Sequence, residues 1–263
     1  MQKISILLSV IFILAACTSS EKSESGTKMA TSDLVLENLK GDVSSYEETP
    51  YKTDSTGKAG EIDSCCISIA EYDENGNGIK TTSKESKGAI KSVTVITRHS
   101  NGLFKSASTT EKGKMANGFE TSLDEKGNFN GAQALDSNGK LDVYYREITQ
   151  DENGNVTGWK QYDKDSVFRQ SGEGKFDKYL QTSFTMKDST GKTKSSSTYK
   201  YNDKNEQIEV SNTNITKDST TTTVTKYTYE THDEMGNWTQ RTTWNDKGKA
   251  TAITKRTYTY RKK

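Results

Sequence analysis

One turn pattern recurs along this chain: an Asp or Asn is followed three residues later by Gly. The pattern occupies residues 54–57, 73–76, 124–127, 136–139, 151–154, 188–191, 233–236 and 245–248, with degenerate copies at 163–166 and 202–205. In such a turn the Asx side chain accepts hydrogen bonds from the amides just ahead of it, and Gly supplies a positive φ. These turns join antiparallel strands, so the pattern predicts a sheet built from hairpins.

The segments between the turns alternate in the way strands do. Clear examples are residues 92–98, 143–149, 198–201, 223–229 and 253–260. In the last two segments the tyrosines two residues apart share one face, and we assign lysine, arginine and threonine to the other face. The sequence therefore predicts an all-β domain over residues 33–263: a single twisted antiparallel β-meander of long hairpins, forming an open or partly rolled sheet.

One short helix is predicted near the start of this domain. Polar residues at 31–33 precede an apolar stripe that ends at Leu39, and Gly41 follows. We expect Leu34, Leu36 and Leu39 to pack against one end of the sheet.

The composition indicates a sheet with a thin core. Hydrophobic residues make up only 30% of the sequence, whereas a typical globular domain has about 45–50%. Thirteen tyrosines and three tryptophans nevertheless favour strands over disorder. Removing residues 1–16, which hold one lysine and no acid, leaves 36 basic (37 minus 1) and 36 acidic side chains. This neutral balance disfavours binding to nucleic acid.

The first residues predict export and lipid attachment. Lys3 precedes an apolar run from Ile4 to Leu14, and small residues follow, which is typical of a secretory signal over residues 1–16. Residues 14–17, Leu-Ala-Ala-Cys, resemble the lipobox of bacterial lipoproteins, which implies acylation of Cys17. Residues 17–32 contain little to bury and predict a flexible tether. Position 18 is Thr rather than the Asp that commonly retains lipoproteins in the inner membrane, so an outer-membrane location is favoured.

Several turns resemble the YD repeat of RHS proteins, Tyr-Asp-x-x-Gly-Asn. Residues 72–77 match it, residues 150–155 match it with Gln in place of Tyr, and residues 227–239 carry a looser copy. The lipobox, the segment 39–43 (Leu-Lys-Gly-Asp-Val) and the late Gly-Asn-Trp hairpin are also similar to small Bacteroidetes lipoproteins of the RHS- or YD-repeat type. In such a host, the Asp-Ser/Thr segments at 54–56, 165–167, 188–190 and 218–220 also resemble O-glycosylation signals. The chain is too short to enclose a toxin, so that role of large RHS proteins does not carry over.

Few residues indicate chemistry. Asp73, Asn75 and Asn77 match the first half of a calcium loop, but position twelve is Lys84 where a bidentate carboxylate belongs, so a plain hairpin turn is favoured. We predict no other metal site and no cofactor. Cys65 and Cys66 are read as two ordinary strand thiols, at least one of them buried, because adjacent cysteines rarely bridge.

No catalytic residue is assigned. His99 lies beside a turn and His232 at a strand end, and neither belongs to a hydrolase or metal-binding motif. The sequence therefore predicts a protein that is not an enzyme.

The aromatic residues are the best candidates for a binding surface. Trp159, Trp238 and Trp244, with tyrosines such as Tyr144, Tyr162 and Tyr258, can form a flat surface that stacks on sugars. The favoured alternative is that they are cross-strand pairs that stabilise the sheet. We therefore expect a lipid-anchored envelope protein, a binding or structural module that presents hairpins to an envelope protein or a glycan. The alternatives are an aromatic carbohydrate platform, an immunity-type lipoprotein that blocks a toxin, and a hydrolase.

Overall fold

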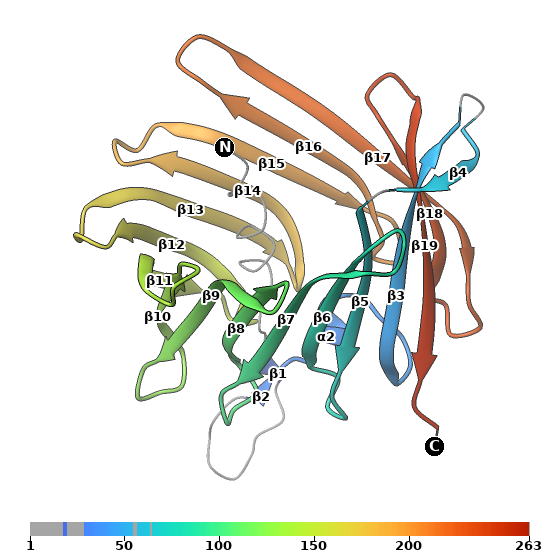
Figure 1. The fold of residues 1–263 in the computed structure, drawn as a ribbon. Coiled ribbons are helices and arrows are strands. Elements are labelled where there is room, and N and C mark those ends of the chain that lie inside the picture. Colours follow the sequence, from blue (N-terminus) through green and yellow to red (C-terminus); the bar gives the residue numbers. More distant parts are fainter. Residues whose placement is uncertain (1–17, 20–28, 55–56, 64, 263) are drawn as a thin grey trace.

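The computed structural model, which describes residues 18–19, 29–54, 57–63 and 65–262, shows a closed antiparallel β-barrel (Figure 1). Strand β3 and strands β5 to β19 form a barrel of 16 strands, and the short β4 is an extra strand between β3 and β5. The barrel strands are β3 (Val43–Thr53), β4 (Ala59–Ile62), β5 (Cys65–Tyr72), β6 (Gly78–Glu85), β7 (Ile90–Arg98), β8 (Phe104–Glu111), β9 (Lys114–Leu123), β10 (Phe129–Leu135), β11 (Leu141–Gln150), β12 (Val156–Asp163), β13 (Phe168–Asp177), β14 (Leu180–Asp188), β15 (Thr193–Tyr201), β16 (Gln207–Ile215), β17 (Thr220–His232), β18 (Trp238–Trp244) and β19 (Ala250–Tyr260). A separate two-stranded ladder joins β1 (Thr18–Ser19) and β2 (Met29–Ala30).

The predicted open or partly rolled sheet is wrong, because the last strand pairs with the first. β19 and β3 are antiparallel, with a register that runs from Ala252 opposite Lys52 to Tyr260 opposite Val43. Each other barrel strand pairs with its neighbours in the sequence, apart from the insertion of β4. The closing pair removes the two free edges that an open sheet would expose.

The Asx-Gly turns coincide with strand ends and have the expected hydrogen bonds. In the turn between β5 and β6, one carboxylate oxygen of Asp73 accepts hydrogen bonds from the amides of Asn75 (2.9 Å) and Asn77 (2.8 Å). Gly76 has a φ of 78°. The degenerate copies place Ser166 and Asn205 at the same position with φ of 64° and 62°. The pattern therefore holds even where glycine is replaced.

The residue after the glycine distinguishes the two ends of the barrel. Turns that follow β5 and the later odd-numbered strands lie at one end of the barrel. Turns that follow β3 and the even-numbered strands lie at the other end. At the first end this residue is asparagine, in the sequences Gly76-Asn77, Gly127-Asn128, Gly154-Asn155 and Gly236-Asn237. At the second end it is an exposed lysine, in the sequences Gly57-Lys58, Gly139-Lys140, Gly191-Lys192 and Gly248-Lys249. We call the first end the asparagine end.

A segment before β3 lies across the asparagine end. The predicted helix is reduced to the four residues of α2 (Asp33–Leu36), and residues 37–40 continue the segment. The amide of Leu34 donates to the carbonyl of Gly76 at 3.1 Å, and the side chain of Asn38 donates to the carbonyl of Lys204 at 2.8 Å. These bonds attach the segment to turns on different parts of the rim. Among the described residues, no helix has the length and apolar character needed to cross a membrane.

The core is small and divided. The larger cluster is formed by side chains of β7 to β12. Its buried rings make a continuous series of aromatic contacts, in the order Phe104, Phe119, Tyr145 and Trp159. The smaller cluster joins the segment at the asparagine end to the wall. Its buried members are Leu34, Leu39, Val43 and Tyr72. Leu36, which we expected to pack against the sheet, is only half-buried.

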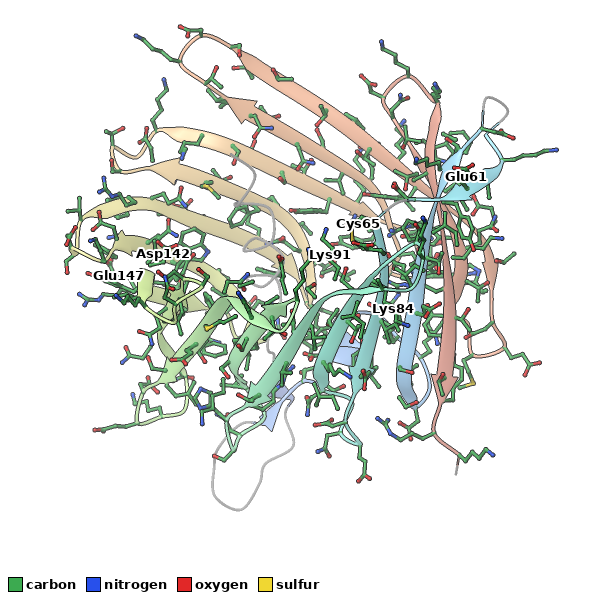
Figure 2. The ribbon with its side chains drawn as sticks, viewed as in Figure 1. Glu61, Cys65, Lys84, Lys91, Asp142 and Glu147 are labelled. Atoms are coloured by element: carbon green, nitrogen blue, oxygen red, sulfur yellow. A yellow bond between two sulfur atoms is a disulfide. The ribbon has the colours of Figure 1, made fainter. Side chains whose placement is uncertain are left out.

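Cys65 and Cys66 differ from the prediction. They form a disulfide with each other instead of two separate thiols, and neither side chain is buried. The ammonium of Lys91 lies 3.2 Å from the sulfur of Cys65, on the neighbouring part of the wall (Figure 2).

Candidate functional site

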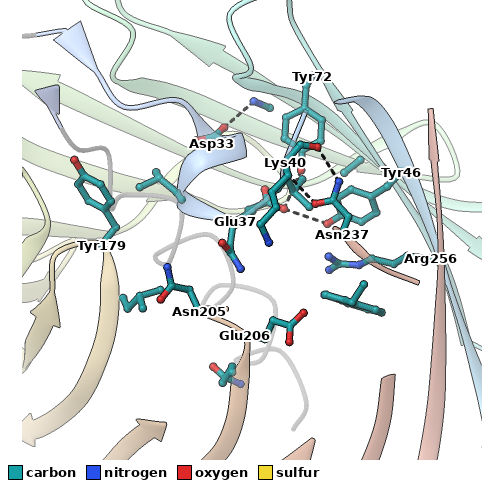
Figure 3. A pocket seen from close by; sticks show the side chains of 18 of the residues that line it. Asp33, Glu37, Lys40, Tyr46, Tyr72, Tyr179, Asn205, Glu206, Asn237 and Arg256 are labelled. Carbon is teal, nitrogen blue, oxygen red and sulfur yellow. Dashed lines mark hydrogen bonds between the residues drawn. The ribbon is translucent and has the colours of Figure 1, made fainter. Parts of the chain in front are cut away.

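The barrel encloses a chamber of about 550 Å³ that reaches the asparagine end (Figure 3). The segment with α2 forms its floor through residues such as Glu37 and Lys40. Its wall comes mainly from β3, β5, β6 and β14 to β19. The volume lies in the range of small-molecule sites.

Stacked aromatic and guanidinium groups cover one side of this wall. The stack runs in the order Tyr46, Arg256, Trp238, Arg241 and Tyr227. The guanidinium of Arg256 lies 4.4 Å from the centre of the Tyr46 ring and 4.0 Å from that of Trp238. Arg241 lies 4.9 Å from the ring centres of both Trp238 and Tyr227. Each arginine is therefore held between two rings, which fixes the plane of the guanidinium and leaves its N–H edges as the binding groups.

The two arginines differ in their charge partners. Arg256 donates from Nε to Glu48 at 2.7 Å. Burial alone would lower the pKa of Arg256, but Tyr46 and Glu48 outweigh it and hold this pKa above its ordinary value. Arg241 forms no ion pair with the described residues, and its buried Nε has no hydrogen-bond partner among them.

Glu37 occupies the floor of the chamber between two tyrosines. Its Oε2 accepts hydrogen bonds from Tyr72 at 2.8 Å and from Tyr46 at 3.3 Å (Figure 3). Desolvation by the surrounding protein raises the pKa of Glu37, and the hydrogen bond from Tyr72 opposes that rise. Because the side chain remains accessible from the chamber, its desolvation is less than that of a carboxyl in a dry core. Burial, followed by the charge of Glu37, raises the pKa of Tyr72.

The chamber tyrosines predict a loss of stability at alkaline pH. Burial raises the pKa of Tyr201 to about 12, from an ordinary value of 10.0. A raised pKa in the folded protein stabilises it below pH 10, and this contribution is lost as the pH rises from 10 through 12. We therefore expect the thermal midpoint to fall between pH 8 and pH 11, and to fall less in Tyr201→Phe. Equal falls in both proteins, measured by circular dichroism, would contradict this assignment.

The structure separates the three predicted stacking residues. Trp159 is buried in the core cluster, packed over Gly172 on the inner face. Trp238 faces the chamber between the two arginines. Trp244 lies opposite the exposed Lys226 on the other face of the wall, where its indole N–H donates to Thr228 at 3.0 Å. The three rings therefore do not form one flat surface.

Other predicted residues have local roles. Asp73, Asn75 and Asn77 lie together in the β5–β6 turn. There the carboxylate of Asp73 accepts hydrogen bonds from the backbone amides of the other two residues. Among the described residues, no group of three or more His, Cys, Asp or Glu is placed to hold a metal ion. Weak calcium binding at this turn stays the alternative to the plain hairpin turn that the sequence favours. Cys17 and the signal segment lie outside the described residues.

The two histidines lie far apart in the fold. His99 makes a hydrogen bond of 3.1 Å with Thr121. His232 lies 2.5 Å from Oε1 of Glu206, and Glu206 lines the chamber. A histidine oriented by a carboxylate is part of a catalytic triad, but no described serine, threonine or cysteine bonds to His232. The pair therefore provides no activated nucleophile.

Sequence reasoning missed Arg241 and Arg256, and it placed the arginine of β19 on the wrong face. Arg256, Tyr258 and Tyr260 are two residues apart, so the same alternation that groups the tyrosines also groups Arg256 with them. The structure confirms this, because Arg256 lies opposite Glu48 and Tyr258 opposite Tyr46 on the inner face. The period of two was sufficient to find Arg256.

Comparison with known proteins supports the fold. No protein-family model matches the chain, and no curated protein matches it. A solved structure of a porin-like protein from Bacteroides uniformis is similar, with a TM-score of 0.52 at 12% identity, covering 82% of this chain and 98% of that one. A porin-like protein from Bacteroides vulgatus gives 0.40 at 14% identity over the same shares. TcdB2-TccC3 gives 0.29 at 13% identity, covering 91% of this chain and 16% of that one. The chain thus has the closed β-barrel fold of the first of these structures.

Proposed function

We propose that this protein is a non-catalytic barrel of the cell envelope, which is moored to the outer membrane by an acylated Cys17 and binds a small polar ligand in its chamber. The chamber with its two stacked arginines, of which Arg241 has no carboxylate partner among the described residues, is the observation that carries the binding role. The lipobox carries the mooring. The likeness to a porin-like protein supports an envelope location, and the wall of this barrel argues for a position in water.

The outer face of the wall is charged. Tyr199 and Tyr201 line the chamber, so Lys200 between them points outward. Across the outer face, Glu209 lies 2.7 Å from Lys200 and 4.0 Å from Lys226. The three residues lie opposite one another on β15, β16 and β17.

A second part of the outer face has the same character. Trp159 and Gly172 face inward, so the residues after them, Lys160 and Glu173, face outward. Lys160 pairs with Glu147 at 2.6 Å, and Glu173 pairs with Lys187 at 2.6 Å. Glu147 lies on β11, at the left of the barrel in Figure 2.

A barrel that spans a bilayer needs a different surface. Such barrels present an apolar outer band about 25 Å tall, and a lysine at its centre costs about 2–4 kcal/mol. On the two parts of the wall described above, the outward side chains of the ion pairs are lysine and glutamate. We therefore infer that water surrounds the wall and that acyl chains, which contribute about 0.8 kcal/mol per buried CH₂, provide the attachment.

The test is the fractionation of Cys17→Ser in the native host. We expect the native chain in the membrane pellet and most of the variant in the soluble envelope fraction, because the variant lacks the acyl chains. Ser19→Ala, which leaves the lipobox intact, is the matched control and should stay in the pellet. Retention of Cys17→Ser in the membrane until detergent is added would contradict the mooring.

A further inference from the structure

Most charged side chains that line the chamber have a partner of opposite charge or a histidine partner. These pairs are Arg256–Glu48, Asp33–Arg98, Lys80–Glu71 and Glu206–His232. Lys40 donates to the carbonyl of Gly236 at 3.3 Å. Arg241 is the lining arginine for which the described residues supply no carboxylate, and its Nε is unsatisfied. Arg241 is half-buried, and an anion in the chamber would supply the counter-charge that the described residues do not.

Arg241 belongs to a row of polar side chains that crosses five neighbouring strands. The row, which we call the polar belt, consists of Gln181, Tyr201, Gln207, Tyr229 and Arg241, all of which line the chamber. Tyr201 lies opposite Gln207, and Tyr229 lies opposite Arg241. The hydroxyl of Tyr201 donates to the carbonyl of Gln181 at 2.9 Å, and that of Tyr229 donates to the carbonyl of Gln207 at 2.8 Å.

Both ends of the polar belt have an unsatisfied polar atom. At one end this atom is Nε of Arg241, a donor, and at the other it is Oε1 of Gln181, an acceptor. Four strand spacings of about 4.8 Å separate them, roughly 19 Å along the wall. Both atoms are closed off from solvent, but other atoms of the two side chains line the chamber, so a ligand with an anionic group near Arg241 and hydroxyl groups along the rest of the polar belt fits it.

From this belt we infer the ligand class: the chamber binds a short acidic oligosaccharide, with a carboxylate against Arg241 and hydroxyl groups along the rest of the polar belt. This inference rests on the proposed function, in which the barrel is a binding module. The planar guanidinium matches a carboxylate. The hydroxyl-rich wall explains the preference for a sugar over an apolar acid.

The experiment is calorimetric titration of the purified full-length chain with three probes. The probes are trigalacturonate, the neutral sugar maltotriose and sodium acetate. We expect trigalacturonate to bind most tightly, and Arg241→Gln to weaken it roughly tenfold to a hundredfold, the range for hydrogen bonds to a charged group. Maltotriose should be insensitive to this change. Lys255→Gln is the matched control, because Lys255 is an exposed cation on β19 that contacts Tyr51.

A second variant keeps the test independent of the folding of Arg241→Gln. Gln181→Glu adds a carboxylate at the far end of the polar belt. It should weaken the binding of trigalacturonate without affecting the binding of maltotriose. Equal binding of both sugars by all variants would overturn the acidic preference but leave a binding module. Acetate binding as tight as trigalacturonate would show a simple ion site and overturn the inference. Absence of sugar binding would also overturn it, whereas the fractionation of Cys17→Ser tests the mooring separately.

Discussion

Replacement of Phe104 by alanine will lower the free energy of unfolding by about 3–5 kcal/mol, the usual cost of removing a buried phenylalanine. The side chain is fully buried at 0% exposure and lies in the larger core cluster. Its ring centre is 6.0 Å from that of Phe119, and Leu103 beside it is also buried. Because only 30% of the chain is hydrophobic, few neighbouring apolar groups can fill the cavity. The check is a guanidinium unfolding curve followed by circular dichroism.

The matched control for Phe104→Ala is Val95→Ala on the neighbouring strand β7. Val95 is 49% exposed, so its truncation should change the stability by less than about 0.5 kcal/mol. A similar loss in both variants would show that the cluster around Phe104 is not the main core of the barrel.

Replacement of Asn237 by alanine should also be strongly destabilising. Asn237 is 2% exposed. Its side-chain amide donates to the carbonyl of Lys40 and to the hydroxyl of Tyr260, both at 2.8 Å, and its oxygen accepts from the amide of Lys40 at 2.8 Å. One side chain thus ties the segment across the asparagine end to a turn and to β19. Each group left unpaired costs roughly 1–3 kcal/mol. We expect a clear drop in the thermal midpoint.

Asn128→Ala provides the control, because Asn128 holds the same position in the β9–β10 turn. Its side chain is exposed, and its side-chain amide makes a hydrogen bond of 3.4 Å to Asp124 within the same turn. The hydrogen bond that defines the turn runs from the backbone amide of Asn128 to Asp124, so it survives the change of side chain. The variant should therefore unfold near the native midpoint. If both asparagines prove equally important, the effect belongs to the turn and not to the segment across the end.

The turns were the part of the fold that local sequence could specify. The Asx side-chain oxygen, the two turn residues and the glycine all lie within five residues. The strand ends could therefore be located without knowledge of the rest of the chain. The closure of the barrel could not be located in this way. Closure depends on the pairing of β19 with β3, which lie far apart in the sequence: Arg256 and Glu48, which face each other, are separated by 208 positions. No local pattern encodes that pairing.

The residues that line the chamber could be predicted only in part from the sequence. Alternation places Arg256 with Tyr258, but it fails for Arg241. Trp238 and Arg241 are three residues apart and both line the chamber, because the register between β17 and β18 shifts twice near Thr231. Such a bulge changes which face a side chain occupies, and the sequence carries no mark of it. The sequence also could not show that Arg241 has no acidic partner among the described residues, since this depends on the arrangement of the whole wall.

The low apolar content is explained by a wall that carries polar side chains on both faces. On β15 to β17, the outward residues include Ser196, Thr198 and Ser211, and the inward residues near the lysine-bearing end include Ser195 and Asn212. A hydrophobic core is then needed only under β7 to β12 and beside α2. This distribution reconciles a large barrel with a polar chain.

The most direct test of a wall that stands in water is thiol labelling of outward positions in isolated envelope membranes. Thr198→Cys and Thr257→Cys place a thiol at exposed sites on β15 and β19, and Asp203→Cys places one in an exposed turn. The native chain is the blank for its own cysteines. We expect a water-soluble maleimide to label the two wall positions as fast as the turn, without detergent. Protection of both wall positions until detergent dissolves the bilayer would contradict the account.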